Sequence, residues 1–253
     1  MISYQVFDAF YLGPLSINFY GIFFALGIIV AIILAKREAK KRNISFDIIE
    51  ELSIYLIFGI IIGARSFYLL FFWPENVQIS FLDIFAVWNG GMAFFGGFIG
   101  AVFTGYIFCK KHNLDYFKFL DLFTIPIIVG HIFGRIGGYL IGNHPGKIVS
   151  SDYIFAIFLE GAYRHPVELY DLIGLIIILG IILLIKNKYK LKKGILFAIY
   201  VLLYGFQRLF VIDNFRTITT DPRYFGFTAS QYIIIILIIF SFMYIYKNYK
   251  LKK

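Results

Sequence analysis

The sequence predicts an all-α, polytopic membrane protein in which residues 1–253 form a single integral membrane domain. Its composition is 60% hydrophobic and 15% charged, whereas soluble proteins carry roughly 25% charged residues. The mean hydropathy is +0.80. Apolar runs of about 20 residues, the length that spans the hydrocarbon core of a bilayer, recur along the chain. The net charge of +9 lies mainly in clusters between these runs, which argues against nucleic acid as a partner.

Seven apolar segments predict seven transmembrane helices, and clusters of cations mark the ends of alternate segments. The clusters KREAKKR, KKHNLDYFK, KNKYKLKK and KNYKLKK follow the first, third, fifth and seventh segments. The second, fourth and sixth segments are the apolar runs between them, and the fifth begins at Pro166, which the first turn of a helix tolerates. We expect the helices at 16–35, 52–73, 90–109, 118–141, 166–185, 194–212 and 228–246.

The distribution of cations also predicts the orientation of the helices. The four clusters hold 17 of the 24 lysines and arginines, and cytoplasmic loops of membrane proteins carry such an excess. The N-terminus is therefore expected outside and the C-terminus in the cytoplasm, as an odd number of spans requires. No cation precedes the first apolar segment, so we expect no cleavable signal peptide. The largest outside segment, 142–165, is long enough for only a small extracytoplasmic head.

Arginine, rather than lysine, predominates away from the clusters. A guanidinium offers a fixed fork of donors that fits phosphate or carboxylate, whereas a lysine near a membrane end acts as a point charge. This contrast predicts a site for an anion within or above the bundle. Six of the seven remaining cations are arginine, namely Arg65, Arg135, Arg164, Arg208, Arg216 and Arg223.

Three of these arginines are expected at a similar depth on different helices. Arg65, Arg135 and Arg208 lie on the second, fourth and sixth spans, about 20 to 25 Å from the cytoplasmic edge. An intramembrane arginine costs at least ~2.5 kcal/mol, and the sequence offers few partners beyond Asp213 and Glu168 near the outer ends. We therefore expect a lipid phosphate to bind them. The alternative is that each arginine pairs with a carboxylate or with carbonyls and only braces the bundle.

Cysteine usage limits the chemistry further. Cys109 is the single cysteine, so internal disulfides and cysteine metal clusters are excluded, and no His-Glu-x-x-His motif is present. We expect no metal and no organic cofactor. Cys109 is predicted at the cytoplasmic end of the third span, far from the arginines, so a thiol that reacts there must arrive on another polypeptide.

Six segments resemble, in the same order, the bacterial prolipoprotein diacylglyceryl transferases. The segment HIFGRIGGYLIGNHPG resembles the Gly-Arg-x-Gly signature of that family, and RHPVELYD resembles its Arg-His-Pro-x-Gln-Leu-Tyr-Glu. WNGGMAFFGGFIGA is similar to its Trp-Asp-Gly-Gly-Met-Ser-x-His-Gly-Gly. INFYG, GARSFYLLFF and YGFQRLFVIDNFR are similar to its first-span, second-span and sixth-span motifs. The resemblance covers nearly the whole chain.

The resemblance implies a transferase of lipoprotein biosynthesis. It implies transfer of the diacylglyceryl group from phosphatidylglycerol to the lipobox cysteine thiol of a prelipoprotein signal peptide, with release of glycerol phosphate. The enzyme would lie in the bacterial cell (inner) membrane, with its active face extracytoplasmic. The chemistry fits the residues, because guanidinium groups favour a thiolate and stabilise a departing phosphate.

Matching positions carry the family's roles onto this chain. Arg135 falls on the signature arginine that binds the lipid headgroup, and Arg208 and Tyr20 are assigned with it to catalysis. Arg65 and Tyr204, together with Arg135, are assigned to substrate binding.

The departures from the family pattern affect the general base. The family histidine of the Gly-Gly-Met segment is Phe95 here, and the asparagine after Gly-Arg-x-Gly is Gly138. His131 is a candidate replacement base, because it precedes Arg135 by four residues and so shares its helix face. A histidine that only bonds a neighbouring helix is the alternative.

Three residues near the outer end complete the predicted site. Asn143 replaces the glutamate of the family's Asn-Gly-Glu run, and we assign it to substrate binding. His165 precedes Pro166, and it either grips the headgroup or substrate or serves as a helix-entry residue. His144 lies in a predicted turn, where we expect it to be solvated.

Two other functions remain open at this point. A catalytically silent or altered relative would bind anionic lipid or lipoprotein precursors without transfer. An anion or lipid transporter is less favoured, because transporters place paired repeats and interrupted helices around a midplane site, and the sequence has neither feature.

Overall fold

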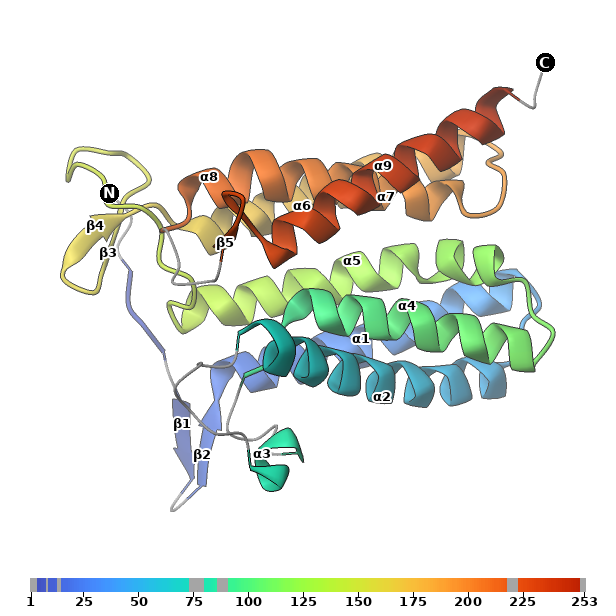
Figure 1. The fold of residues 1–253 in the computed structure, drawn as a ribbon, viewed down its shortest axis with the longest axis horizontal. Helices are drawn as coiled ribbons and strands as arrows, with labels where there is room; N and C mark the ends of the chain where they lie inside the picture. The colour runs from blue at the N-terminus through green and yellow to red at the C-terminus, as the bar shows by residue number, and fades with distance from the viewer. Residues whose placement is uncertain are drawn as a thin grey trace. The chain divides into compact units, whose positions relative to one another are not determined.

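The computed structural model describes residues 4–7, 9–12, 15–72, 80–85, 91–217 and 223–250, so residues 88–90 of the predicted Gly-Gly-Met segment lie outside the described residues. The chain forms two compact units. The first contains Met1–Ala35, Leu120–Thr219 and Ile234–Lys253, and the second contains Lys36–Phe119 and Thr220–Ile233. Figure 1 shows that helices dominate both units.

Each predicted span corresponds to a helix. Six stretches of the described residues are long and apolar enough to cross a membrane, which confirms a polytopic membrane protein. The helix α4, of 18 residues and ending in two lysines, is not among the six, so the seven-span count and the orientation stay predictions. The helices are α1 (Phe19–Lys41), α2 (Phe46–Phe71), α4 (Phe94–Lys111), α5 (Tyr116–Leu140), α6 (Val167–Lys188), α7 (Ile195–Phe206) and α9 (Ala229–Lys250), with short helices α3 (Phe81–Phe85) and α8 (Asp213–Phe215).

Among the described residues, three short antiparallel hairpins add to the predicted all-α fold. The hairpin that lies within the predicted head segment turns at Glu160 and Gly161, whose φ angles of 51° and 74° suit a tight two-residue turn. Strands of two to four residues give too little alternation to be recognised in the sequence. The pairs are β1 (Ala9–Leu12) with β2 (Leu15–Asn18), β3 (Ile157–Leu159) with β4 (Ala162–Arg164), and β5 (Arg223–Tyr224) with β6 (Phe227–Thr228).

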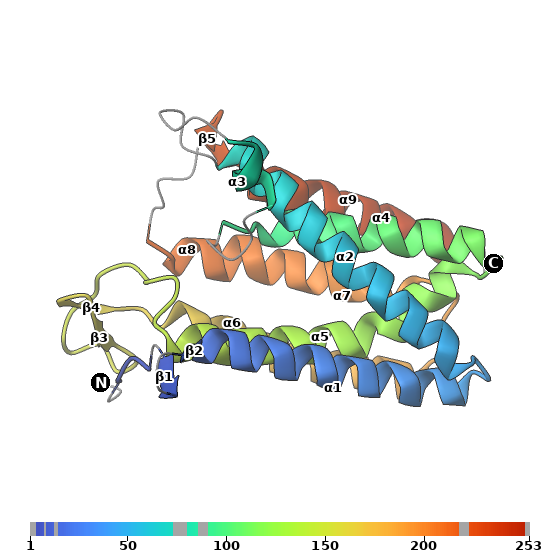
Figure 2. The same ribbon diagram turned by 90° about the horizontal axis from the view of Figure 1, so that it is seen from below.

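Glycine and a capping carboxylate hold the helices of the first unit together. A Cβ on Gly27 of α1 would lie 2.9 Å from the carbonyl oxygen of Gly130 on α5, so the two backbones approach closely (Figure 2). Asp121 of α5 caps α7, because its carboxylate accepts from the backbone N–H groups of Gly194 at 2.7 Å and Phe197 at 3.0 Å.

In the second unit, α2 and α4 pack side by side through glycines (Figure 1). A Cβ on Gly100 would lie 2.0 Å from the carbonyl oxygen of Gly59, and one on Gly63 would lie 2.3 Å from that of Gly96. Both clashes involve backbone, which cannot rotate away. The interface therefore requires glycine on both helices.

This contact gives a test of the fold with a matched pair of substitutions on α4. Gly100→Ala should lower the stability of the protein by about 1–3 kcal/mol, because the added methyl overlaps backbone. Gly105→Ala should change stability by less than about 0.5 kcal/mol, because the nearest atom to its Cβ would be 3.6 Å away. Thermal unfolding in detergent measures both, and equal melting temperatures would contradict the packing of α2 against α4.

Candidate active site

Arg135 on α5 is held between two buried carboxylates from α6. Its Nη1 donates to Oε2 of Glu168 at 3.0 Å, and its Nε lies 2.9 Å from Oδ2 of Asp171. The two acidic side chains are only 6% and 1% exposed. They lie three residues apart and so share one face of α6. The guanidinium is thereby fixed in place.

The glycines beside Arg135 make room for its partners. A Cβ on Gly138 would lie 3.2 Å from Cδ of Glu168, so the absence of a side chain lets the carboxylate approach α5. A Cβ on Gly137 would lie 3.2 Å from Cα of Tyr20, so α1 also packs closely at this level. These glycines therefore bring three helices together around Arg135.

Two aromatic side chains complete the surroundings of Arg135. Its Nε donates to Nε2 of His131 at 3.2 Å, and its charge acts on the hydroxyl of Tyr204. The His131 ring contacts the Tyr204 ring edge-on, with centroids 4.9 Å apart. Because the lone pair of Nε2 accepts from a guanidinium, it is not available to take a proton from a substrate thiol. This geometry is at odds with His131 as a base and suits a role in orienting Arg135.

Asp171 has a second partner from the chain after α7. The carboxamide of Gln207 donates to Oδ1 of Asp171 at 2.7 Å and to its carbonyl oxygen at 3.0 Å. Gly174 lies against this carboxamide, where a Cβ would come within 2.4 Å. Asp171 is therefore held from two helices.

Arg208 lies on a π-helix, Gln207–Ile212, that continues α7. Its Nε is 3.5 Å from Oδ1 of Asp213, and its side chain is 12% exposed. Within the described part of the chain, its guanidinium makes this ion pair and no hydrogen bond. Its charge also acts on Asp171 and Tyr204. Arg208 thus keeps donors for an anion beside Arg135 and its two carboxylates, Glu168 and Asp171, which are called the Arg135 cluster below. Single π-helical turns are common at functional sites.

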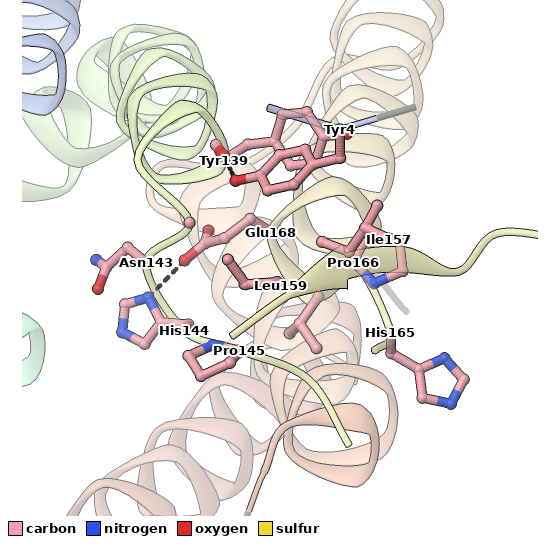
Figure 3. Close-up of a pocket in the computed structure, with 12 residues that line it drawn as sticks. Tyr4, Tyr139, Asn143, His144, Pro145, Ile157, Leu159, His165, Pro166 and Glu168 are labelled. Carbon is pink, nitrogen blue, oxygen red and sulfur yellow. Dashed lines mark hydrogen bonds and ion pairs between the residues drawn. The ribbon is translucent and has the colours of Figure 1, made fainter. Parts of the chain in front are cut away.

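The loop after α5 folds back over the end of the helix, so that His144 reaches Glu168. Gly142, with φ 66°, ends the helix, and the N–H of Asn143 donates back to the carbonyl oxygen of Gly138 at 3.0 Å. Nδ1 of His144 then lies 2.5 Å from Oε1 of Glu168 (Figure 3). We expected His144 to be solvated; its side chain is 30% exposed, but the left-handed turn directs its ring toward a buried carboxylate.

Burial lowers the pKa of His144 below its ordinary value, and the neighbouring Glu168 offsets only part of this effect. The charges of Arg216 and Arg135 also lower this pKa. The imidazole is therefore neutral at pH 7.

The other predicted residues of this unit lie near the cluster or at its margin. Tyr20 is 38% exposed at the start of α1, where the charges of Arg135 and Glu168 act on it. Asn143 is exposed in the loop after α5. His165 bonds the hydroxyl of Tyr170 at 3.0 Å, and Figure 3 shows its ring pointing away from Glu168.

Arg65 belongs to the second unit. It is buried, its Nη1 donates to the carbonyl oxygen of Gly91 at 2.9 Å, and its guanidinium lies 5.6 Å from the ring centre of Tyr68. That Arg65 joins the other two arginines at one site stays a prediction.

One expectation about the arginines needs correction. The sequence was expected to offer few carboxylates inside the bundle, but Arg135 has two, and a bound phosphate is not needed to balance its charge. Asp171 was missed, although its spacing of three residues from Glu168 places both on one helix face. The expected outer carboxylates Glu168 and Asp213 do pair with Arg135 and Arg208.

Comparison with known proteins gives a consistent result. The chain matches the family model described as prolipoprotein diacylglyceryl transferase over residues 8–247. It is 32% identical to the phosphatidylglycerol–prolipoprotein diacylglyceryl transferase of Streptococcus pneumoniae serotype 4, over 96% of this chain and 94% of that protein. It is 33% identical to the protein of the same name from Bacillus velezensis, over 92% and 88%, and 34% identical to transferase 1 of Clostridium perfringens, over 86% and 84%.

Proposed function

The chain belongs to the prolipoprotein diacylglyceryl transferase family, and we propose a route by which its own residues carry out the transfer. It is a membrane-embedded transferase of lipoprotein biosynthesis that takes a diacylglyceryl group from phosphatidylglycerol to a prolipoprotein. The acceptor is the lipobox cysteine thiol of the signal peptide, and the second product is glycerol phosphate. The working face is the outer face of the bacterial inner membrane, with α4 as the third of seven spans and 142–165 as a small extracytoplasmic head.

The reaction is a displacement at a carbon of the lipid glycerol. The thiolate of the lipobox cysteine attacks the carbon that carries the phosphate ester, a C–S bond forms and the C–O bond breaks. The electron pair leaves on the glycerol phosphate. The nucleophile comes from the prolipoprotein, because Cys109, the single cysteine of the chain, lies buried toward the lysine-rich end of α4.

The arginines act on the departing phosphate. Arg208 has unused donors, and it can form new hydrogen bonds as charge develops on the leaving oxygen. The charge of Arg135 is balanced by Glu168 and Asp171, and this guanidinium is held in place where it lines the site beside Arg208. His131 orients Arg135.

The remaining predicted residues bind the lipid and the peptide. The hydroxyls of Tyr20 and Tyr204 donate to phosphate oxygens, and Arg65, Asn143 and His165 contact the headgroup or the signal peptide. The observation that carries the proposal is the family match over residues 8–247 together with a guanidinium, that of Arg208, that keeps free donors beside the buried cluster.

Complementation tests the function in cells. The gene should restore growth and lipoprotein processing in a bacterial strain depleted of its own transferase, and the Arg208→Gln variant should not. If the wild-type protein reaches the membrane at a normal level and processing remains blocked, the chain is a silent relative rather than an enzyme.

A further inference from the structure

We propose that His144 is the general base that takes the proton of the substrate thiol, and that Glu168 is a positioning residue that fixes its imidazole. The inference rests on the proposed transfer, because it concerns the activation of that nucleophile. It assigns the deprotonation of the thiol to a side chain of this chain's own outer loop.

The contact between the two side chains determines which nitrogen of His144 carries the proton. Oε1 of Glu168 lies 2.5 Å from Nδ1, and Oε2 of the same carboxylate accepts from Arg135. A carboxylate bound to a guanidinium is ionised and accepts hydrogen bonds, so Nδ1 carries the hydrogen and donates it. Nε2 is then the basic nitrogen. It makes no hydrogen bond within the described residues, and the side chain is 30% exposed, so a substrate can reach it.

The space beside Gly138 lets the Glu168 carboxylate lie close to α5 and reach His144. A Cβ on Gly138 would lie 3.3 Å from both carboxylate oxygens, so a larger side chain there would crowd the carboxylate. The missing side chain therefore helps to place Glu168 beside His144.

The other histidines of the unit are occupied. Nε2 of His131 accepts from Arg135 at 3.2 Å, and Nδ1 of His165 bonds Tyr170 while its ring points away from Glu168 (Figure 3). His144 is the histidine that combines a buried carboxylate partner with an accessible nitrogen. Burial also lowers its pKa, which keeps the imidazole neutral and able to accept a proton at pH 7.

The step balances in protons and electrons. Nε2 of His144 takes the proton of the S–H group, and the sulfur lone pair attacks the lipid carbon. The C–S bond forms as the C–O bond breaks, and the electron pair leaves on glycerol phosphate. The carboxylate of Glu168 stabilises the imidazolium until its proton passes to water or to the phosphate product.

The substitution His144→Asn tests the base with little disturbance of the backbone. His144 has φ 67°, a conformation that asparagine tolerates, and the asparagine amide can still donate to Glu168. The transfer rate at pH 7 to a synthetic lipobox peptide in phosphatidylglycerol nanodiscs should fall about 100-fold. The loss should shrink as the pH approaches the thiol's own pKa of about 8.5, because the thiol then ionises unaided. Added imidazole should restore part of the rate.

The substitution Glu168→Gln separates positioning from base catalysis. The groups that face His144 are Glu168, Arg135 and Arg216, and of these Glu168 alone stabilises the imidazolium. Its neutralisation should lower the pKa of His144, so the acid limb of the pH–rate profile should move to lower pH. The plateau rate should fall about 10-fold, because the tautomer is no longer fixed. If Glu168 had a purely structural role, the acid limb of the pH–rate profile would not move.

The matched control is His112→Asn, which changes a histidine at the end of α4 that pairs with Glu51 at 3.3 Å. It should transfer at the wild-type rate. If the wild-type protein gives no lipidated peptide, the proposed function fails. If the wild type is active but His144→Asn keeps its rate at pH 7, or loses activity equally at every pH without imidazole rescue, His144 is not the base.

Discussion

Replacing Arg208 by glutamine should lower the rate of diacylglyceryl transfer about 100-fold to 1,000-fold while the protein stays folded. The guanidinium makes one long ion pair, to Asp213 at 3.5 Å, so its removal disturbs few contacts. Its donors are instead available to the phosphate that leaves. Because that charge develops in the transition state, the loss should appear in kcat more than in the KM for lipid.

Steady-state rates of purified variants in nanodiscs with varied phosphatidylglycerol content measure this effect. Arg208→Lys should regain little activity, because an ammonium does not reproduce the two-pronged fork. Arg223→Gln is the control, since Arg223 is an exposed arginine whose Nη1 donates to the carbonyl oxygen of Gly226 in a surface hairpin. A rise in KM with kcat unchanged would show that Arg208 only binds the lipid.

Replacing Arg135 by methionine should destabilise the protein by about 3–5 kcal/mol. The substitution leaves Glu168 and Asp171 buried without their cation, and each carboxylate is at most 6% exposed. The expected result is a low level of folded protein in the membrane and an early unfolding transition in detergent.

A triple variant separates this structural effect from catalysis. Arg135→Met combined with Glu168→Gln and Asp171→Asn removes all three charges together, and Gln207 can still donate to the new amide oxygen. Stability should return to near the wild-type value, while transfer stays absent. If the single variant Arg135→Met is as stable as wild type, the guanidinium does not brace the cluster.

The helices could be predicted because the membrane imposes a simple rule on sequence. Runs of about 20 apolar residues, alternate ones ended by lysines, define segments, and the seven long helices follow them. The largest differences are six residues: α1 ends at Lys41 rather than 35, α2 begins at Phe46 rather than 52, and α7 ends at Phe206, where a π-helix continues it to 212. The rule says little about structure outside the hydrocarbon. The hairpin β3–β4 and the return of His144 over α5 depend on positive φ angles at positions such as Glu160 and Gly142, which local sequence indicates only weakly.

The site could be predicted only in part. Arginine in an apolar segment is conspicuous, so the sequence pointed to Arg135 and Arg208, and it offered Glu168 and Asp213 as partners near the outer ends, where the ion pairs form. That these arginines act on the substrate stays a prediction. Asp171 was not predicted, because its role depends on sharing one face of α6 with Glu168 and on the packing of α6 against α5. The π-helix that carries Arg208 depends on the packing of Gln207 against Asp171 and Gly174, a tertiary contact with no local signal.

The most direct measurement counts both products of one reaction. Purified protein in phosphatidylglycerol nanodiscs, given a lipobox peptide, should form lipidated peptide and glycerol phosphate in equal amounts, as read by mass spectrometry and enzymatic phosphate assay. A peptide with serine in place of cysteine should give neither product. Glycerol phosphate released without lipidated peptide, or lipid bound with no product of either kind, would contradict transfer to a thiol at this cluster.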